Sequence, residues 1–351
     1  MNSLIIDKQT ITQDKELRFA LEKLNQVPDN LTLFVLDSNH VLVGSLTDGD
    51  VRRGLLMGHT LDDKVEHFMF KNFKYIAEHN FSLQDIRHLK ESRIKLVPMV
   101  DKDMHIIRLI DMVKSKSVLP LDVIIMAGGK GERLKPLTDN MPKPLLKVGD
   151  TPILEHNLNH IVSYGINRIH ISINYLGEMI MNYFGDGSNR NIDIRYINED
   201  QPLGTLGAAT LMKEINYDHI LVMNADVLTN IDLEDFFKEH LEQEAVMSIA
   251  SVPYKINMPF AVLETAENRV MAFTEKPEYT YYTNAGIYLI HRSLLSRIPS
   301  NTMYHATDLM QDILNKKEKL MQYSIHGFWM DIGRKEDFQK AQTEIKHFYS
   351  K

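Results

Sequence analysis

"IIMAGGKGERLKPLTDNMPKPLLKV" (residues 124–148) joins a short apolar run to a segment rich in glycine and positive charge. The apolar run predicts a buried strand, because strands covered on both faces show continuous rather than alternating hydrophobicity. Gly128, Gly129 and Gly131 follow where this strand must turn. Glycine has no Cβ, so the backbone amides of such a turn can approach an anion closely. A phosphate group is therefore the expected ligand at this strand end.

Three cations follow the glycines within one loop: Arg133, Lys135 and Lys143. Prolines in the same loop fix φ and stiffen it. A stiff set of cations suits a ligand that carries several phosphates; a solvated basic loop is the alternative interpretation. The segment is not a Walker A loop, since lysine and Ser/Thr do not follow the last glycine. The dinucleotide-binding fingerprint is also missing, since Leu134 stands where it needs a glycine.

After this segment, strand patterns and helix patterns alternate along the chain. The alternation predicts an α/β fold, with a Rossmann-like, mainly parallel sheet and helices on both faces. Sheets of this kind bind ligands at the carboxyl ends of their strands. The expected strands include residues 167–174, 193–199 and 219–226, and the expected helices include residues 152–165, 205–214 and 232–244.

The first third of the chain contains an internal repeat. "LTLFVLDSNHVLVGSLTDGDV" (residues 31–51) can be laid over "IKLVPMVDKDMHIIRLIDMVK" (residues 94–114), which brings Asp37 near Asp101. Strand-like and helix-like runs in both copies are shorter than those later in the chain. We therefore expect a small duplicated α/β unit ahead of the larger sheet.

A polar segment, "KSKSVLPLD" (residues 114–122), follows the repeat and suits a linker because it contains Pro120. A chain of 351 residues is also long for one average domain. We therefore predict two domains, residues 1–118 and residues 121–351.

The composition limits the functions to consider. A formal charge of −7 and a pI near 6.1 argue against nucleic acid and anionic membranes as partners. The chain has no cysteine, which excludes disulfides, thiolate zinc sites and cysteine nucleophiles. Its first residues, "MNSLIIDKQTITQDKELRFAL", carry acidic groups and no long apolar core, so we expect neither a signal peptide nor a membrane anchor. A cytoplasmic enzyme is the expectation.

The glycine-rich stretch, "AGGKGERLKPLT…PKPLLKV", resembles the signature of the sugar-1-phosphate nucleotidylyltransferases. Later stretches resemble the same family, in family order, and extend the likeness over residues 121–351. The resemblance implies a GT-A-like nucleotidyltransferase fold. These stretches are "EDQPLGTLGA" (199–208), "VMNADVL" (222–228), "FTEKP" (273–277), "NAGIYLI" (284–290) and "FWMDIGRKEDF" (328–338).

The resemblance implies a role for each matching residue around the nucleotide. The three loop glycines would hold a nucleoside triphosphate, and Arg133 would neutralise charge on its phosphates. Lys143 would hold the sugar phosphate. Gln201 and Gly204, in "QPLGT", match positions that contact the base and its ribose.

Two further groups of residues match positions at the metal and the sugar. Asp226 and Asp331 match the carboxylates that bind Mg²⁺; each also follows an apolar run, so both are expected at the ends of strands. Glu275, Lys276 and Asn284 match positions that touch the sugar and its phosphate.

The repeat in the first third resembles a pair of CBS motifs, the modules named after cystathionine β-synthase. Thr47 and Asp50 stand where such motifs often hold a ribose or a phosphate, which would make an adenine or guanine nucleotide the ligand. Asp111 and Lys114 replace these two residues in the second copy. A purely structural role in forming a dimer is the alternative.

The implied reaction joins a sugar 1-phosphate to a nucleoside monophosphate, releasing pyrophosphate by direct in-line displacement. CBS motifs fused to such a domain resemble the glucosamine-1-phosphate guanylyltransferases of legionaminic acid synthesis, so GTP and glucosamine 1-phosphate are the expected substrates. A thymidylyltransferase, or a mannose- or heptose-1-phosphate guanylyltransferase, is the close alternative. A nucleotide-sensing regulatory protein without catalysis is the alternative from another class. We expect a homo-oligomer, formed through either domain.

Overall fold

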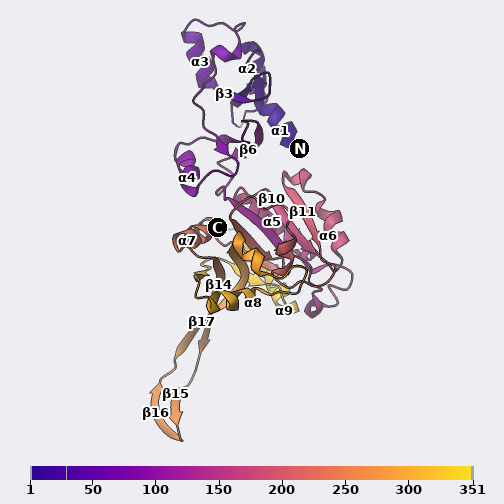
Figure 1. The fold of residues 1–351 in the computed structure, drawn as a ribbon, viewed down its shortest axis with the longest axis vertical. Coiled ribbons are helices and arrows are strands. Elements are labelled where there is room, and N and C mark those ends of the chain that lie inside the picture. The colour runs from indigo at the N-terminus through magenta and orange to yellow at the C-terminus, as the bar shows by residue number, and fades with distance from the viewer. Residues whose placement is uncertain (1, 29, 349–351) are drawn as a thin grey trace. The chain divides into compact units, whose positions relative to one another are not determined.

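The computed structural model describes residues 2–28 and 30–348 (Figure 1). The chain packs as two compact units. The first comprises the residues up to Pro120 together with Ile161–Ile169 and Phe184–Ile194, and the second comprises Leu121–His160, His170–Tyr183 and the residues from Arg195 onward. The predicted domains, residues 1–118 and 121–351, stay a prediction.

The first unit contains two three-stranded sheets with the same strand order and the same strand directions. In each sheet the first strand runs parallel to the second, and the second runs antiparallel to the third. The duplication expected from the sequence is therefore present in the structure. The sheets are β1 (Thr10–Thr12), β2 (Thr32–Leu36) and β3 (Leu42–Thr47), and β4 (Ile76–Ala77), β5 (Leu96–Val100) and β6 (Ile106–Asp111).

Equivalent aspartates hold the hairpin turn of each sheet. Asp37 Oδ1 accepts hydrogen bonds from the backbone amides of Asn39 and Val41, at 2.8 and 2.9 Å. Asp101 Oδ1 accepts the same pair of bonds in the second copy. Aspartate favours such turns because its short side chain reaches amides two residues on. The helices of this unit are α1 (Asn2–Gln9), α2 (Leu17–Asn25), α3 (Asp48–Leu56) and α4 (Leu83–Glu91).

A seven-stranded sheet organises the second unit. Its pairs β10–β7, β7–β12 and β14–β18 are parallel, whereas β17 runs antiparallel to both β12 and β14. The mainly parallel sheet predicted from the sequence is confirmed. Its order is β11 (Asp193–Asn198), β10 (Arg168–Ile173), β7 (Leu121–Met126), β12 (His219–Asn224), β17 (Glu278–His291), β14 (Met247–Asn257) and β18 (Leu320–Ser324).

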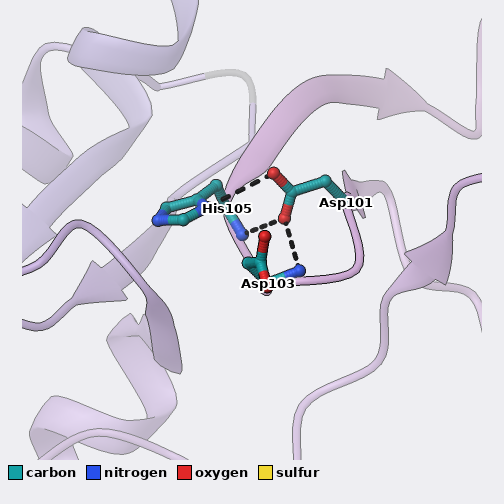
Figure 2. A group of neighbouring side chains, drawn as sticks. All are labelled: Asp101, Asp103 and His105. Atoms are coloured by element: carbon teal, nitrogen blue, oxygen red, sulfur yellow. Dashed lines mark hydrogen bonds and ion pairs between the residues drawn. The ribbon is translucent and has the colours of Figure 1, made fainter.

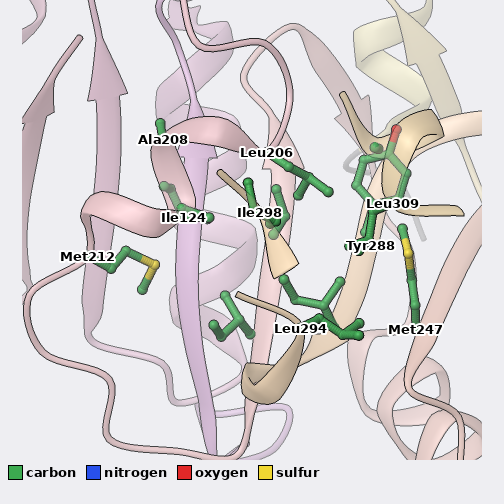
Figure 3. Close-up of a cluster of buried hydrophobic side chains, with 14 of the residues drawn as sticks. Ile124, Leu206, Ala208, Met212, Met247, Tyr288, Leu294, Ile298 and Leu309 are labelled. Atoms are coloured by element: carbon green, nitrogen blue, oxygen red, sulfur yellow. The ribbon is translucent and has the colours of Figure 1, made fainter. Parts of the chain in front are cut away.

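Helices cover both faces of this sheet. Met247 of β14 packs in a buried cluster with Leu309 of α8 (Ala306–Asn315), shown in Figure 3. The next residue, Ser248, bonds to His240 of α7 (Leu233–Glu242). Successive side chains of a strand point to opposite faces, so α7 and α8 lie on opposite sides of the sheet. This agrees with the predicted arrangement.

The helix predicted over residues 205–214 is wrong. The structure has only the short 3₁₀ helix η5 (Gly207–Leu211) there. The Leu206 amide donates to the Tyr304 carbonyl and the Tyr304 amide donates to the Leu203 carbonyl, so the backbone here pairs with a distant loop. A Cβ on Gly207 would lie 2.5 Å from the backbone carbonyl oxygen of Thr302. Tertiary pairing therefore replaces the local helix.

Further strands and helices after β7 lie outside the seven-stranded sheet. β13 (Val227–Thr229) pairs antiparallel with β19 (Trp329–Asp331), outside the main sheet. The other elements are β8 (Lys147–Val148), β9 (Thr151–Pro152), α5 (Ile153–Ser163), α6 (Gly177–Phe184) and α9 (Lys335–Phe348). Every helix in the described part of the chain is too short or too polar to cross a lipid bilayer.

Two strands of the main sheet continue beyond it as a projecting ribbon, which we call the arm (residues 252–283). The outer halves of β14 and β17 pair with each other along the arm. β15 (Val262–Ala266) and β16 (Arg269–Thr274) form the hairpin at its end (Figure 1).

Candidate active site

A buried ion pair lies at the carboxyl end of β12. Lys143 begins the 3₁₀ helix η3 (Lys143–Leu145), and Asp226 follows β12 by two residues. The Lys143 ammonium donates to Asp226 Oδ2 at 2.5 Å. Lys143 is 7% exposed, whereas the Asp226 side chain keeps 30% of its surface exposed. Because a buried cation is costly without a partner, the pair fixes Lys143 in one position.

Asp331 lies directly beside this pair. It stands opposite Val227 in the β13–β19 ladder, and the Ile332 amide donates to the Asp226 carbonyl at 3.0 Å. Desolvation by the surrounding protein raises the pKa of the Asp331 carboxyl, and the negative charge of Asp226 raises it further, although one side of Asp331 stays open to solvent. The structure thus brings together the two carboxylates that the sequence suggested as metal ligands.

Arg133 completes a group of two cations and two carboxylates. It lies in the 3₁₀ helix η2 (Glu132–Leu134), and its positive charge lowers the pKa of Asp331. A Cβ on Gly333 would lie 3.2 Å from Asp331 Oδ2 and 3.6 Å from Arg133 Nη1. Both charged groups therefore flank Gly333.

The glycine loop is held at both ends and open in the middle. A Cβ on Gly128 would lie 2.9 Å from Glu199 Oε1. Gly131 has φ +64°, and its carbonyl accepts a hydrogen bond from the Thr138 hydroxyl at 2.8 Å. Nothing lies within 4 Å of a Cβ built on Gly129, which is exposed. The loop can therefore present backbone to a ligand at Gly129.

Glu199 packs against this loop at Gly128, and sequence reasoning predicted no role for it. The Ser172 hydroxyl donates to Glu199 Oε1, and the Leu203 amide donates to its Oε2 at 2.9 Å. A cavity of about 520 Å³ beside it is lined by Asn198 and by residues of the segment 173–181. Glu199 directly follows β11, whose sequence DIRYIN is not a continuous apolar run, so the rule that identified Asp226 does not find Glu199.

Gln201 and Gly204 pack against a distant loop. The Gln201 amide donates to the Asn301 carbonyl at 2.9 Å. Gly204 has φ +73°, and a Cβ there would lie 2.7 Å from the backbone carbonyl oxygen of Tyr304. Their proposed contacts with the base and ribose stay a prediction.

Asn284 lies near the charged group, in the part of β17 that enters the sheet. Asn284 Oδ1 accepts from the Gly286 amide at 2.9 Å. Burial raises the pKa of Tyr288; the hydrogen bond with Asn284 lowers it, and the charge on Asp226 raises it. Tyr288 was missed in the sequence because it lies within an apolar strand pattern. The indole of Trp329 donates to the Ala285 carbonyl at 2.9 Å, so it packs in this region.

Glu275 and Lys276 lie elsewhere, in the arm. Both are exposed, directly after β16. A single copy of the chain therefore does not bring them to the group around Asp226. Their assignment to the sugar depends on the family resemblance alone.

Thr47 and Asp50 of the first unit cap a helix. The amide and hydroxyl of Thr47 donate to Asp50 Oδ2 at 2.8 and 2.5 Å, which forms a capping box for α3. Arg53 pairs with the same carboxylate. This capping explains both residue types without a ligand. A separate cavity of about 580 Å³ in this unit is lined by Lys15, Lys23 and other residues.

One further cluster, Asp101, Asp103 and His105, has metal-ligand chemistry (Figure 2). Its hydrogen bonds are those of the hairpin turn described above, with His105 Nδ1 also 3.3 Å from Asp101 Oδ2. The first copy of the repeat forms the same turn with Asp37 and no comparable ligands. Turn formation therefore accounts for this cluster.

Comparison with known proteins identifies the family to which residues 122–347 belong. The sequence matches the family described as Nucleotidyl transferase over residues 122–347. It is 32% identical over 231 residues to a mannose-1-phosphate guanylyltransferase of Mycobacterium tuberculosis, covering 64% of this chain and 64% of that protein's length. It is 29% identical over 235 residues to the D-glycero-alpha-D-manno-heptose 1-phosphate guanylyltransferase of Aneurinibacillus thermoaerophilus, covering 65% of this chain and all of that protein.

Solved structures show the same similarity. HddC from Yersinia pseudotuberculosis, complexed with GMP-PN, superimposes with a TM-score of 0.51 and 25% sequence identity. The match covers 64% of this chain and 99% of that chain.

Proposed function

Because the chain belongs to the nucleotidyl transferase family, we propose that it transfers a nucleoside monophosphate from a nucleoside triphosphate to a sugar 1-phosphate. The observation that carries this proposal is the Lys143–Asp226 ion pair, placed beside Asp331 and Arg133 at the end of the sheet. In the proposed reaction an oxygen of the sugar phosphate attacks the α-phosphorus. The bond from that phosphorus to pyrophosphate breaks, and pyrophosphate leaves with the bonding electrons.

The attacking phosphate is already an anion, so no side chain needs to remove a proton. The main obstacle is repulsion between two polyanions, which fixed cations reduce. We assign Arg133 to the triphosphate and Lys143 to the sugar phosphate. Gly128, Gly129 and Gly131 would offer backbone amides to the triphosphate, and Gln201 and Gly204 would contact the base and ribose. Glu275, Lys276 and Asn284 remain assigned to the sugar.

Asp226 and Asp331 would hold Mg²⁺. Asp226 directly precedes β13, Asp331 ends the paired strand β19, and the negative charge of Asp226 raises the pKa of Asp331, as expected where a cation is needed. Two carboxylates with phosphate oxygens and water suit the octahedral preference of Mg²⁺. When bound, the ion would reduce the charge of the reacting phosphates.

We propose GTP as the donor. The names of the relatives from Mycobacterium and Aneurinibacillus support a guanylyltransferase, as does the HddC complex with GMP-PN. Mannose 1-phosphate and heptose 1-phosphate are the acceptors that these names support. Glucosamine 1-phosphate, and with it legionaminic acid synthesis, depends on the resemblance of the first unit to CBS motifs. Thymidylyl transfer is the further alternative.

The first unit would bind a regulatory adenine or guanine nucleotide. Its cavity, where Lys15 and Lys23 lie with Asp7 and Glu22, has room for such a ligand, whereas the side chains of Thr47 and Asp50 cap a helix. We also propose that the enzyme is cytoplasmic and forms a homo-oligomer. The second candidate function is nucleotide sensing without catalysis; the presence of Arg133, Lys143, Asp226 and Asp331 at the matching positions argues against it.

The test is a panel of four nucleoside triphosphates, each combined with mannose, heptose and glucosamine 1-phosphates in the presence of Mg²⁺. Pyrophosphate release is the measurement, and reactions without sugar phosphate are the control for hydrolysis. We expect release with GTP and one sugar phosphate. Absence of release from every combination would contradict the proposed activity and favour the sensor.

A further inference from the structure

One face of the arm carries uncovered apolar side chains. Tyr254 stands opposite Tyr281, and Ile256 stands opposite Tyr279. Residues two apart on a strand share a face, so these four side chains form one patch, which we call the tyrosine face. Their exposed fractions range from 39% for Ile256 to 59% for Tyr254. The arm is thus uncovered where it is most apolar.

The other face of the same ribbon carries its charged side chains, together with Tyr282. Lys255 and Glu278 lie on it and form an ion pair at 2.7 Å. Thr280, opposite Lys255, belongs to this polar face as well. The ribbon therefore has one face suited to water and one face suited to burial.

The end of the arm continues the apolar surface. Leu263 and Phe273 stand opposite each other in the β15–β16 hairpin and are 55% and 69% exposed. Phe260 and Met271 are 75% and 69% exposed. An isolated two-stranded hairpin is marginally stable in water, so a ribbon with this composition needs a packing partner.

The size of the exposed surface matches that of a dimer interface. An aromatic side chain offers about 150–250 Å² for burial, so five exposed aromatic residues of the arm leave roughly 600 Å² uncovered. Monomers rarely expose more than a few hundred Å² of contiguous apolar surface, and a stable dimer buries about 800 Å² on each partner. These five are Tyr254, Phe260, Phe273, Tyr279 and Tyr281; Ile256, Leu263 and Met271 add further exposed apolar area.

We propose that a second copy of this chain covers the tyrosine face, with the two arms packed face to face about a twofold axis. Such an axis places the same patch on both partners, so the patch must complement itself. The tyrosine face meets this condition because it holds no charged side chain, and the charges of the ribbon lie on its other side. Each chain carries a net charge of −7, so two copies approach best through an uncharged surface. This interface is independent of the proposed chemistry.

The test uses the full chain. Light scattering on the eluting protein should give twice the chain mass of 40.6 kDa at micromolar concentration. The double variant Tyr254→Glu/Tyr281→Glu should elute as a monomer, because the like charges would have to be buried together. Thr280→Glu, on the polar face of the same ribbon, is the matched control and should stay dimeric. Circular dichroism checks that each variant is folded.

Cross-linking provides a second measurement that needs no disruptive variant. The chain has no cysteine, so one introduced thiol reports on its surroundings alone. Tyr279→Cys should be linked to its copy by a flexible reagent that joins two thiols, because two packed tyrosine faces bring the thiols within its reach, whereas Thr280→Cys should not. A monomeric wild-type protein would overturn the proposal, as expected if the arm folds onto its own chain. A dimer that persists in the double variant and does not cross-link through Tyr279→Cys would also overturn it, since another surface would then form the interface.

Discussion

Lys143 and Asp226 are 83 residues apart in the chain, and their side chains meet in an ion pair of 2.5 Å. The pair joins the basic loop after β7 to the end of β12, two neighbouring parallel strands of the main sheet. Because Lys143 is buried, it cannot reorient in solvent as a surface lysine does. The pair therefore holds the Lys143 ammonium in a fixed position beside the open glycine loop. Removal of this cation should lower the rate of catalysis.

Lys143→Ala should lower kcat for pyrophosphate release by roughly 10² or more, the usual scale for losing one such electrostatic contact. The physical reason is that two anionic reactants would meet without a fixed cation. Steady-state kinetics with saturating substrates is the measurement. Lys135→Ala is the matched control, because Lys135 lies in the same loop, is exposed and pairs weakly with Asp139 at 3.7 Å. Equal activity of the two variants would remove Lys143 from the proposed reaction.

Asp331→Asn should abolish most activity without lowering the melting temperature. The folded protein raises the pKa of Asp331 through desolvation and through repulsion from Asp226, so the ionised carboxylate does not favour folding at neutral pH. An amide of the same size removes the repulsion and one oxygen ligand. Activity at increasing Mg²⁺ and thermal unfolding are measured together. Asp337→Asn serves as the comparison, and a large drop in the Asp331→Asn melting temperature would contradict this explanation.

The two glycines at the start of the loop should respond differently to alanine. In Gly128→Ala the new Cβ would lie 2.9 Å from Glu199 Oε1 and 3.3 Å from Asn174 Cβ, so Glu199 must move and the melting temperature should fall. In Gly129→Ala the new methyl enters open space, so the protein should stay as stable as the wild type. Thermal unfolding without ligands distinguishes these cases. The same melting temperature for both variants would show that Glu199 does not pack on Gly128.

Sequence reasoning predicted the main sheet because each of its central strands is a continuous apolar run. It also grouped Asp226 with the glycine loop, since residues that follow such strands meet at one edge of a sheet. Asp331 reaches this group differently, from β19, which pairs with β13 outside the main sheet. The helix over residues 205–214 was predicted wrongly because local propensity cannot register a loop a hundred residues away that takes the Leu206 amide. Strand directions were equally hidden, and β17 runs antiparallel within the sheet.

The arm was not predicted, for a similar reason. Residues 252–283 contain ordinary strand patterns, and nothing in a single chain says whether a ribbon packs on its own sheet or projects from it. Glu275 and Lys276 therefore lie away from the site that the family resemblance suggested. The pairing of Thr47 with Asp50 was also open to two interpretations, since Thr-x-x-Asp forms a helix cap as readily as a ligand contact.

Stability should fall as the pH drops below 6.5 because of two histidines where α7 packs on the main sheet, His219 of β12 and His240 of α7. Burial, together with repulsion from His219 and His291, lowers the pKa of His240 to about 3. Burial and repulsion from His291 lower the pKa of His219 to about 4. His240 Nε2 lies 3.0 Å from His219 Nδ1, and His240 Nδ1 lies 2.8 Å from the Ser248 hydroxyl, so protonation of both rings would place two like charges in contact away from water. Both rings stay neutral in the folded protein while the unfolded chain takes up protons near pH 6.5.

The sign of the effect follows from this difference. Below pH 6.5 the unfolded state binds more protons than the folded state, so each histidine costs up to about 1.4 kcal/mol of folding free energy per pH unit. The loss should level off near pH 3 to 4, where the folded histidines also titrate. Urea unfolding at pH 7.5, 6.5, 5.5 and 4.5 measures it. His240→Gln should give a flatter dependence than the wild type, with His326→Gln as the control because its side chain is exposed. Parallel curves for the wild type and His240→Gln would mean that His240 takes up its proton alike in the folded and unfolded states, which would contradict the lowered pKa of His240.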